Sequence, residues 1–95
     1  MITSLAAQPA GPGAEITFTL SGEARIAAEI INLAGRPVRL LTADRPMTAG
    51  TKRLVWDGRS ATGVSVPAGV YLVRVGAAAQ SGQQATAVTS MALLR

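Results

Sequence analysis

The feature that most constrains this chain is a period of two in its apolar residues. Polar and apolar side chains alternate from Glu15 to Ser21, again from Arg25 to Ile30, and most regularly from Val70 to Val75. Successive side chains of a β-strand point to opposite faces, so this alternation predicts strands that bury one face. No segment outside these runs has the apolar spacing and the capping residues of a helix. The pattern therefore predicts an all-β chain.

Seven strands are predicted from such runs, with turn residues between them. The predicted strands are Ile2–Ala7, Glu15–Ser21, Arg25–Ile30, Val38–Leu41, Lys52–Trp56, Val70–Val75 and Ala85–Leu94. The predicted connections are the break Pro9–Gly13, the turns Asn32–Pro37 and Ala77–Gln84, the loop Thr42–Gly50 and the long connection Asp57–Gly69. Short, regularly spaced antiparallel strands indicate a β-sandwich with Greek-key crossings.

The length of the chain sets the expected domain organisation. Its 95 residues, 48% of them hydrophobic, leave room for one apolar core. We expect residues 1–95 to form a single domain, in which residues 1–13 supply an edge strand and a break, and residues 14–95 form the core sandwich.

The charge pattern argues against a nucleic-acid or membrane partner. Nine basic residues against five acidic ones give a net charge of +4, but they are scattered singly and no aromatic residues are interleaved with them. No apolar run reaches the roughly 18 residues that a membrane-spanning helix needs. The N-terminal segment lacks the features of a signal peptide, so if the protein is exported its signal is expected upstream.

The stretch from Leu54 to Val75 holds the only tryptophan and the only tyrosine of the chain. Leu54 and Trp56 share the inward positions of their strand, so the indole is expected to fill the space between two sheets. Tyr71 is expected to point inward as well. These are positions of core residues rather than of an exposed sugar platform.

The connection after Trp56 carries several turn residues. The Asp57 carboxylate is expected to accept hydrogen bonds from backbone N–H groups about two residues further on. Gly58 and Gly63 are expected to adopt a positive φ. Pro67 and Gly69 are expected to set the chain's return into the sandwich.

These residues resemble a known family. The pattern Trp56-Asp57-Gly58-Arg59 followed by Val66-Pro67-Ala68-Gly69-Val70-Tyr71 is similar to the FlgD-type immunoglobulin-like domain, and so are Ile16–Leu20, Ile30–Val38 and Met91–Arg95. The family is named for the flagellar hook-capping protein. It occurs as a C-terminal module of exported bacterial proteins and includes relatives of type IX secretion sorting domains.

The resemblance implies an immunoglobulin-like antiparallel β-sandwich outside the cytoplasm or on the cell surface. It also implies that the motif residues Trp56, Asp57, Gly58, Gly63, Pro67, Gly69 and Tyr71 are structural and that no catalytic set is carried over. Gln8-Pro9 stands where sorting domains have Asn-Pro, and the chain ends in Arg95 rather than in a lysine-rich strand. These two departures argue against a type IX sorting role.

The residue inventory does not predict an enzyme. There is no histidine or cysteine, and the single lysine, Lys52, is expected on an outward strand position. Among the acids, Glu29 and Asp57 are the one pair for which an approach is conceivable, but Glu29 faces outward. No clustered carboxylates indicate a metal site, and no cofactor is predicted.

Two non-catalytic functions compete at this point. The first is a C-terminal module of a larger exported or cell-surface bacterial protein, acting as spacer, stabiliser, or attachment or sorting element. The second is a self-assembling subunit of an extracellular filament or of a hook-cap-like structure, since the edge strands Ile2–Ala7 and Ala85–Leu94 are poorly protected by charge. The expected partners are other domains of the parent protein or copies of this chain. A carbohydrate-binding module is a weaker third alternative, and a small-molecule ligand is not expected.

Overall fold

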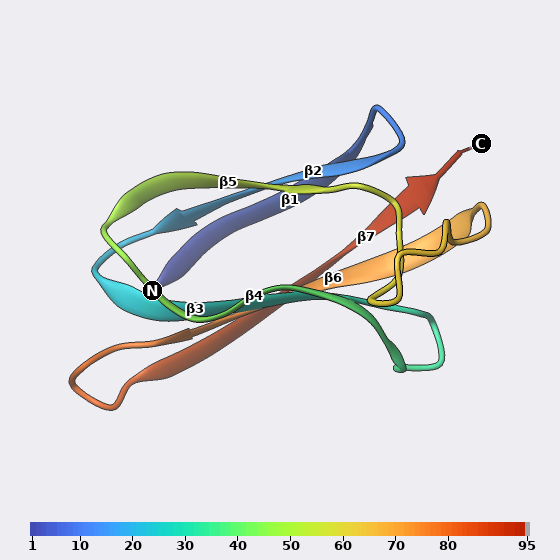
Figure 1. The fold of residues 1–95 in the computed structure, drawn as a ribbon. Coiled ribbons are helices and arrows are strands. Elements are labelled where there is room, and N and C mark those ends of the chain that lie inside the picture. The colour runs from blue at the N-terminus through green and yellow to red at the C-terminus, as the bar shows by residue number, and fades with distance from the viewer. Residues whose placement is uncertain (95) are drawn as a thin grey trace.

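In the computed structural model, residues 1–94 are described, and they form seven β-strands without a helix (Figure 1). The strands are β1 (Ile2–Ala10), β2 (Gly13–Leu20), β3 (Ala24–Ile31), β4 (Pro37–Met47), β5 (Gly50–Trp56), β6 (Gly69–Ala78) and β7 (Gln84–Leu93). The all-β prediction and the number of strands are confirmed. Within residues 1–94, nothing with the length and apolarity of a membrane-crossing helix was found.

The strands are arranged as an immunoglobulin-like sandwich of two antiparallel sheets. One sheet has the order β1-β2-β5 and the other the order β4-β3-β6-β7. The chain passes from one sheet to the other after β2, after β4 and again after β5, and Figure 1 shows the resulting two layers. This arrangement accounts for the predicted Greek-key crossings.

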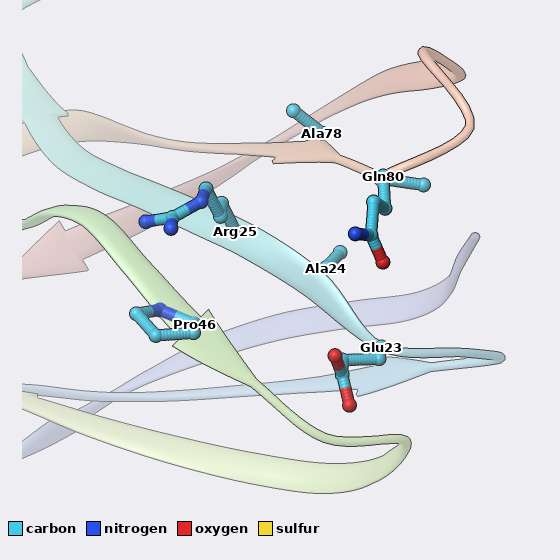
Figure 2. A pocket seen from close by; sticks show the side chains of 7 residues that line it. Glu23, Ala24, Arg25, Pro46, Ala78 and Gln80 are labelled. Carbon is cyan, nitrogen blue, oxygen red and sulfur yellow. The ribbon is translucent and has the colours of Figure 1, made fainter.

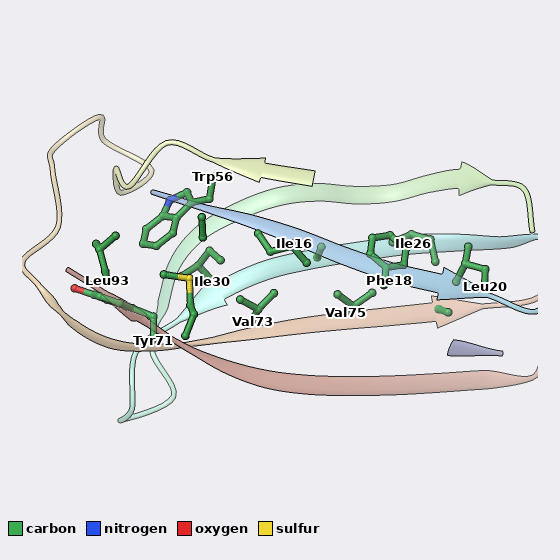
Figure 3. Packing of buried hydrophobic residues seen from close by; sticks show 14 of the residues in the cluster. Ile16, Phe18, Leu20, Ile26, Ile30, Trp56, Tyr71, Val73, Val75 and Leu93 are labelled. Atoms are coloured by element: carbon green, nitrogen blue, oxygen red, sulfur yellow. The ribbon is translucent and has the colours of Figure 1, made fainter. Parts of the chain in front are cut away.

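The core lies between the layers and follows from the alternation in the sequence. Ile16, Phe18 and Leu20 of β2 face Ile26 and Ile30 of β3, and each of these side chains is 2% exposed or less. Val73 and Val75 of β6 are buried beside them, and Trp56, Tyr71 and Leu93 close one end of the core (Figure 3). The apolar residues at every second position therefore build one continuous core, as the pattern predicts.

The predicted break at Pro9–Gly13 is wrong in its extent. β1 continues through Pro9 and Ala10, which pair with Ala14 and Gly13, so the turn consists of Gly11 and Pro12. A proline lacks a backbone N–H, but the outer side of an edge strand does not need this donor. Since β1 is the edge of its sheet, Pro9 fits within the strand.

The predicted loop Thr42–Gly50 is also wrong, because most of it belongs to β4. This strand pairs with β3 along its whole length, from Ile31 opposite Pro37 to Ala24 opposite Met47, with several register shifts. Asp44 has a φ of 50°, which is uncommon for a residue other than glycine. Bulges of this kind let an edge strand continue past proline and irregular positions.

Lys52 lies on the inner side of β5, not on the predicted outward side. It is opposite Phe18, and Leu54 is opposite Ile16, so the three apolar residues and Lys52 share one face of the sheet. The lysine is half-buried at the margin of the sandwich, where its Nζ donates to Oγ1 of Thr48 at 2.9 Å. Its alkyl stem covers apolar surface while the ammonium group reaches a polar partner.

The other boundaries shift by small amounts. β5 begins at Gly50, β6 continues to Ala78 and β7 begins at Gln84, so the predicted Ala77–Gln84 turn shortens to residues 79–83. The terminal strands β1 and β7 lie at sheet margins, as predicted, and they pack beside each other on the same side of the sandwich. Arg95, the predicted charge at the end of the last strand, lies outside the described residues.

Candidate functional site

The candidate site is the end of the sandwich where β5 leaves its sheet and β6 begins. Trp56 is the last residue of β5 and is 1% exposed. Its ring meets that of Tyr71 edge to face, with centroids 5.6 Å apart and an interplanar angle of 67°. The indole Nε1 donates to the carbonyl oxygen of Arg59 at 2.9 Å. The ring is thus both a core side chain and an anchor for the connection that follows it.

The turn after Trp56 is held by the carboxylate of Asp57. Its Oδ1 accepts a hydrogen bond from the backbone N–H of Arg59 at 3.0 Å, two residues further on. Gly58 has a φ of 77° and is buried. Both features agree with the geometry that the sequence predicts for an aspartate-glycine turn.

Arg39 of β4 reaches this turn from the opposite sheet. Its Nη1 lies 3.4 Å from Oδ1 of Asp57, 3.4 Å from the carbonyl oxygen of Arg59 and 3.3 Å from that of Ser60. The backbone N–H of Ala61 also donates to the carbonyl of Val38 at 3.1 Å. The connection between β5 and β6 is therefore fixed to β4. Sequence reasoning missed Arg39, because a pairing over eighteen positions leaves no local spacing signal.

The rest of the connection is a compact hairpin-like excursion. Gly63 has a φ of 85°, its N–H donates to the carbonyl of Ser60 at 2.9 Å, and its own carbonyl accepts from Nη1 of Arg59 at 2.9 Å. An isolated bridge joins Arg59 to Ser65. Gly63 itself is exposed, so it lies in the outer part of the excursion, away from the two aromatic rings.

The return into the sandwich is fixed by Tyr71. Its hydroxyl donates to the carbonyl oxygen of Pro67 at 2.6 Å, four residues earlier, and its side chain is 7% exposed. Gly69, at the start of β6, has a φ of 153°, a conformation that favours glycine. A tyrosine near the start of the sixth strand, bonded to the backbone just upstream, has the form of the tyrosine corner of immunoglobulin-like sandwiches.

Gly13 is a further part of this end that the sequence did not reveal. It begins β2 and lies so close to β5 that an added Cβ would overlap the carbonyl oxygen of Trp56 and the amide nitrogen of Gly58. Its φ is not in the left-handed region, so its requirement is one of space. Sequence patterns place Gly13 in a turn and do not show which backbone approaches it.

The arrangement offers little for chemistry. Glu29 pairs with Arg74, Asp57 with Arg39, Glu15 with Arg53 and Asp44 with Arg25. Glu29 and Asp57 thus form separate ion pairs with different arginines. No group of three or more potential metal ligands occurs within residues 1–94. The burial of Trp56 and Tyr71 also excludes a sugar platform made of these two rings.

A shallow hollow lies at the opposite end of the four-stranded sheet. It has a volume of about 430 Å³ and is lined by Glu23, Ala24, Arg25, Pro46, Ala78, Ala79 and Gln80 (Figure 2). Three of its seven lining residues are alanine, and the guanidinium of Arg25 already pairs with Asp44 at 3.6 Å. A specific small-molecule site usually encloses its ligand, which this open hollow does not.

Comparisons with known proteins show which solved structures share this fold. No protein-family model matches the chain, and no curated protein matches it. Among solved structures, FlgD from P. aeruginosa superposes with a TM-score of 0.72 at 16% identity, over 96% of this chain and 71% of that one. Dimeric latent PorU from Porphyromonas gingivalis superposes with a TM-score of 0.62 at 22% identity, over 96% of this chain. The matched part is 9% of the PorU chain. The fold is thus that of a FlgD-like immunoglobulin-like domain.

Proposed function

We propose that the chain is a non-catalytic β-sandwich module of a larger exported or cell-surface bacterial protein, where it serves as spacer, stabiliser or attachment element. The observation that carries this proposal is the PorU comparison. There the same fold covers 96% of this chain but is 9% of a much longer polypeptide. A small sandwich of this kind therefore occurs as one part of a large protein.

The geometry of the candidate site supports a structural role for its residues. Asp57, Gly58, Pro67 and Tyr71 are engaged in one continuous set of backbone and side-chain contacts around Trp56. Such contacts hold the end of a sandwich in a single conformation. We propose that residues 1–95 act as one domain, and that these motif residues, together with Gly63 and Gly69, are its scaffold.

The second candidate function is a self-assembling subunit. β7 favours it, since Gln84–Leu93 is the margin of a sheet and contains neither a charged residue nor a proline. Subunits of filaments join through such edges when a neighbour donates a strand. We rank it second because β1 packs beside β7 and restricts access to that side.

The two functions predict native polypeptides of different mass and different cellular location. An antibody raised against the 9.7 kDa chain is used on fractionated cells that encode it. The module function predicts a much larger immunoreactive species in the surface or secreted fraction, sensitive to protease added to intact cells. An immunoreactive species of about the chain's own mass confined to the cytoplasm contradicts the proposal, and the same species in extracellular filaments supports the second function.

Absence of catalysis is tested separately. The purified chain is assayed against glycan, peptide and ester substrates, with heat-unfolded chain as the control. We expect no turnover above that control. Saturable turnover that co-purifies with the folded chain would overturn the proposal.

A further inference from the structure

The two outer faces of the sandwich differ in character. On the β1-β2-β5 sheet, hydroxyl groups of Ser4, Thr19 and Thr51 are joined across the strands, and Arg53 pairs with Glu15. Within the described residues, Val55 is the one large apolar side chain exposed on this face, which is otherwise mainly polar. It has the composition of a solvated surface.

The outer face of the β4-β3-β6-β7 sheet carries more large apolar side chains than the other face, although Thr86 and Ser90 of β7 and two ion pairs also lie on it. Leu40, Val70 and Val88 are 55%, 46% and 53% exposed, and Leu72 is half-buried among them. Small residues occupy other positions of this face: Ala27, Gly76, Ala78 and Ala92. A face with several exposed apolar side chains is a candidate for contact with a partner.

The charges on this face balance each other, although the whole chain carries +4. Arg74 forms an ion pair with Glu29 at the centre of the face, and Arg25 pairs with Asp44 at one end. The central pair belongs to one row across the sheet. In this row Leu40 is opposite Glu29, Glu29 is opposite Arg74, and Arg74 is opposite Val88.

This row is complementary to itself. A two-fold axis parallel to the strands, midway between β3 and β6, places each strand of one copy over its counterpart across the axis. Glu29 then faces Arg74 of the second copy, and Leu40 faces its Val88. A two-fold axis across the strands would instead place Glu29 over Glu29, which like-charge repulsion disfavours. Of these two arrangements, both of which keep the strands aligned, the charge pattern favours the axis parallel to the strands.

The available area is sufficient for such a contact. Four strands with a spacing of about 4.8 Å and a length of about 33 Å present roughly 600 Å² on each copy. The total of roughly 1,200 Å² lies at the lower end of the range for specific protein interfaces. Sheets that pack face to face also keep their strands nearly aligned, as this axis requires.

We infer that this face is a dimer interface, and that its occupant is a second copy of the chain, packed sheet on sheet with Glu29 facing Arg74. The dimer goes beyond the proposed function, because a spacer or attachment module needs no second copy. Failure of the dimer therefore leaves the proposed function standing.

The test uses two charge variants and their mixture, measured by sedimentation velocity from micromolar to millimolar concentration. Arg74→Glu and Glu29→Arg each bring like charges together in the homodimer. Each variant alone should therefore have a dimer dissociation constant about tenfold or more above that of the unchanged chain. Mixed in equal amounts, they restore both opposite-charge contacts and should associate. Far-UV circular dichroism checks that both variants are folded.

Two further variants separate this face from the other one. Val88→Asp places a charge within the proposed interface and should abolish association, whereas Val55→Asp on the opposite sheet should leave it unchanged. A chain that is monomeric at every concentration overturns the inference, which is the result expected if a different domain covers this face. A dimer unaffected by Val88→Asp, or a mixture of the two charge variants that stays monomeric, overturns it as well.

Discussion

At the scale of single residues, the fold depends most on the contacts around one indole. Trp56 fills the end of the core, packs edge to face on Tyr71 and donates to the backbone of the following turn. The alternation of the sequence was sufficient to predict its inward direction. The hydrogen bond to Arg59 could not be predicted, because it depends on the conformation of a turn that the indole itself stabilises.

Replacing Trp56 with alanine should lower the free energy of unfolding by about 3–5 kcal/mol, since the variant loses a large buried side chain and leaves a cavity. Urea unfolding followed by circular dichroism measures this loss. Val55→Ala is the matched control, because Val55 is the adjacent residue and is 67% exposed. Comparable stability of the two variants would show that the indole is not part of the core in solution.

Gly13 is the second residue whose replacement should affect stability strongly. Gly13→Ala should destabilise the chain by about 1–3 kcal/mol, because the new methyl group overlaps the backbone at Trp56 and Gly58 and forces the strands apart. Gly22→Ala is the control, since nothing lies within 4 Å of a Cβ added there and its φ is outside the left-handed region. Equal thermal melting temperatures for the two variants would contradict the close approach of β2 and β5.

At the scale of elements, the strands with clean alternation were predicted well, and the irregular edge strand was not. β2, β3 and β6 owe their burial pattern to side chains at every second position, which a sequence displays directly. β4 has proline, charged residues and register shifts, so its pattern resembles that of a loop. It is a strand because β3 offers it hydrogen-bonding groups along its full length, and this pairing is a tertiary effect.

The candidate site shows the same division. The turn geometry of Asp57 and Gly58 follows from local chemistry and was predictable. The contributions of Arg39 and Gly13 come from strands that are distant in sequence, and only the folded sandwich brings them together.

The side chain of Arg39 joins β4 to the connection between β5 and β6. Arg39→Ala should lower the free energy of unfolding by only about 1 kcal/mol, because its contacts to Asp57 and the two carbonyl groups are long and partly exposed. It should loosen the connection locally, so the amide of Ala61 should exchange with solvent faster, while amides in the core strands change little. Arg36→Ala removes the same charge from an exposed turn and is the control. Unchanged exchange at Ala61 would show that Arg39 does not fix the connection.

At the scale of the whole molecule, the edge strands of the two sheets differ in how well they are protected against pairing with another chain. β4 carries prolines, charges and bulges, β5 carries Lys52 and Arg53, and β1 contains Pro9. β7 has none of these along Gln84–Leu93. Its neighbour on that side is β1, which pairs with β2 and packs beside β7. We infer that β1 protects two edges at once, those of β2 and β7.

Deleting residues 1–10 should therefore promote association, because it exposes the backbone groups of β2 and uncovers β7. The deletion ends before Gly13, so the contact with Trp56 is kept. Both the full and the truncated chain carry Arg74→Glu, which removes the proposed face-to-face contact, and their sedimentation is compared at matched concentrations. A third variant adds Thr19→Lys to the truncated chain, where the outward charge on the new edge should suppress strand pairing. If the truncated chain stays monomeric, β1 is not needed to protect the edges of β2 and β7 from association. If the truncated chain associates equally with and without Thr19→Lys, the association does not run through the exposed edge of β2. The uncovered side of β7 then accounts for it.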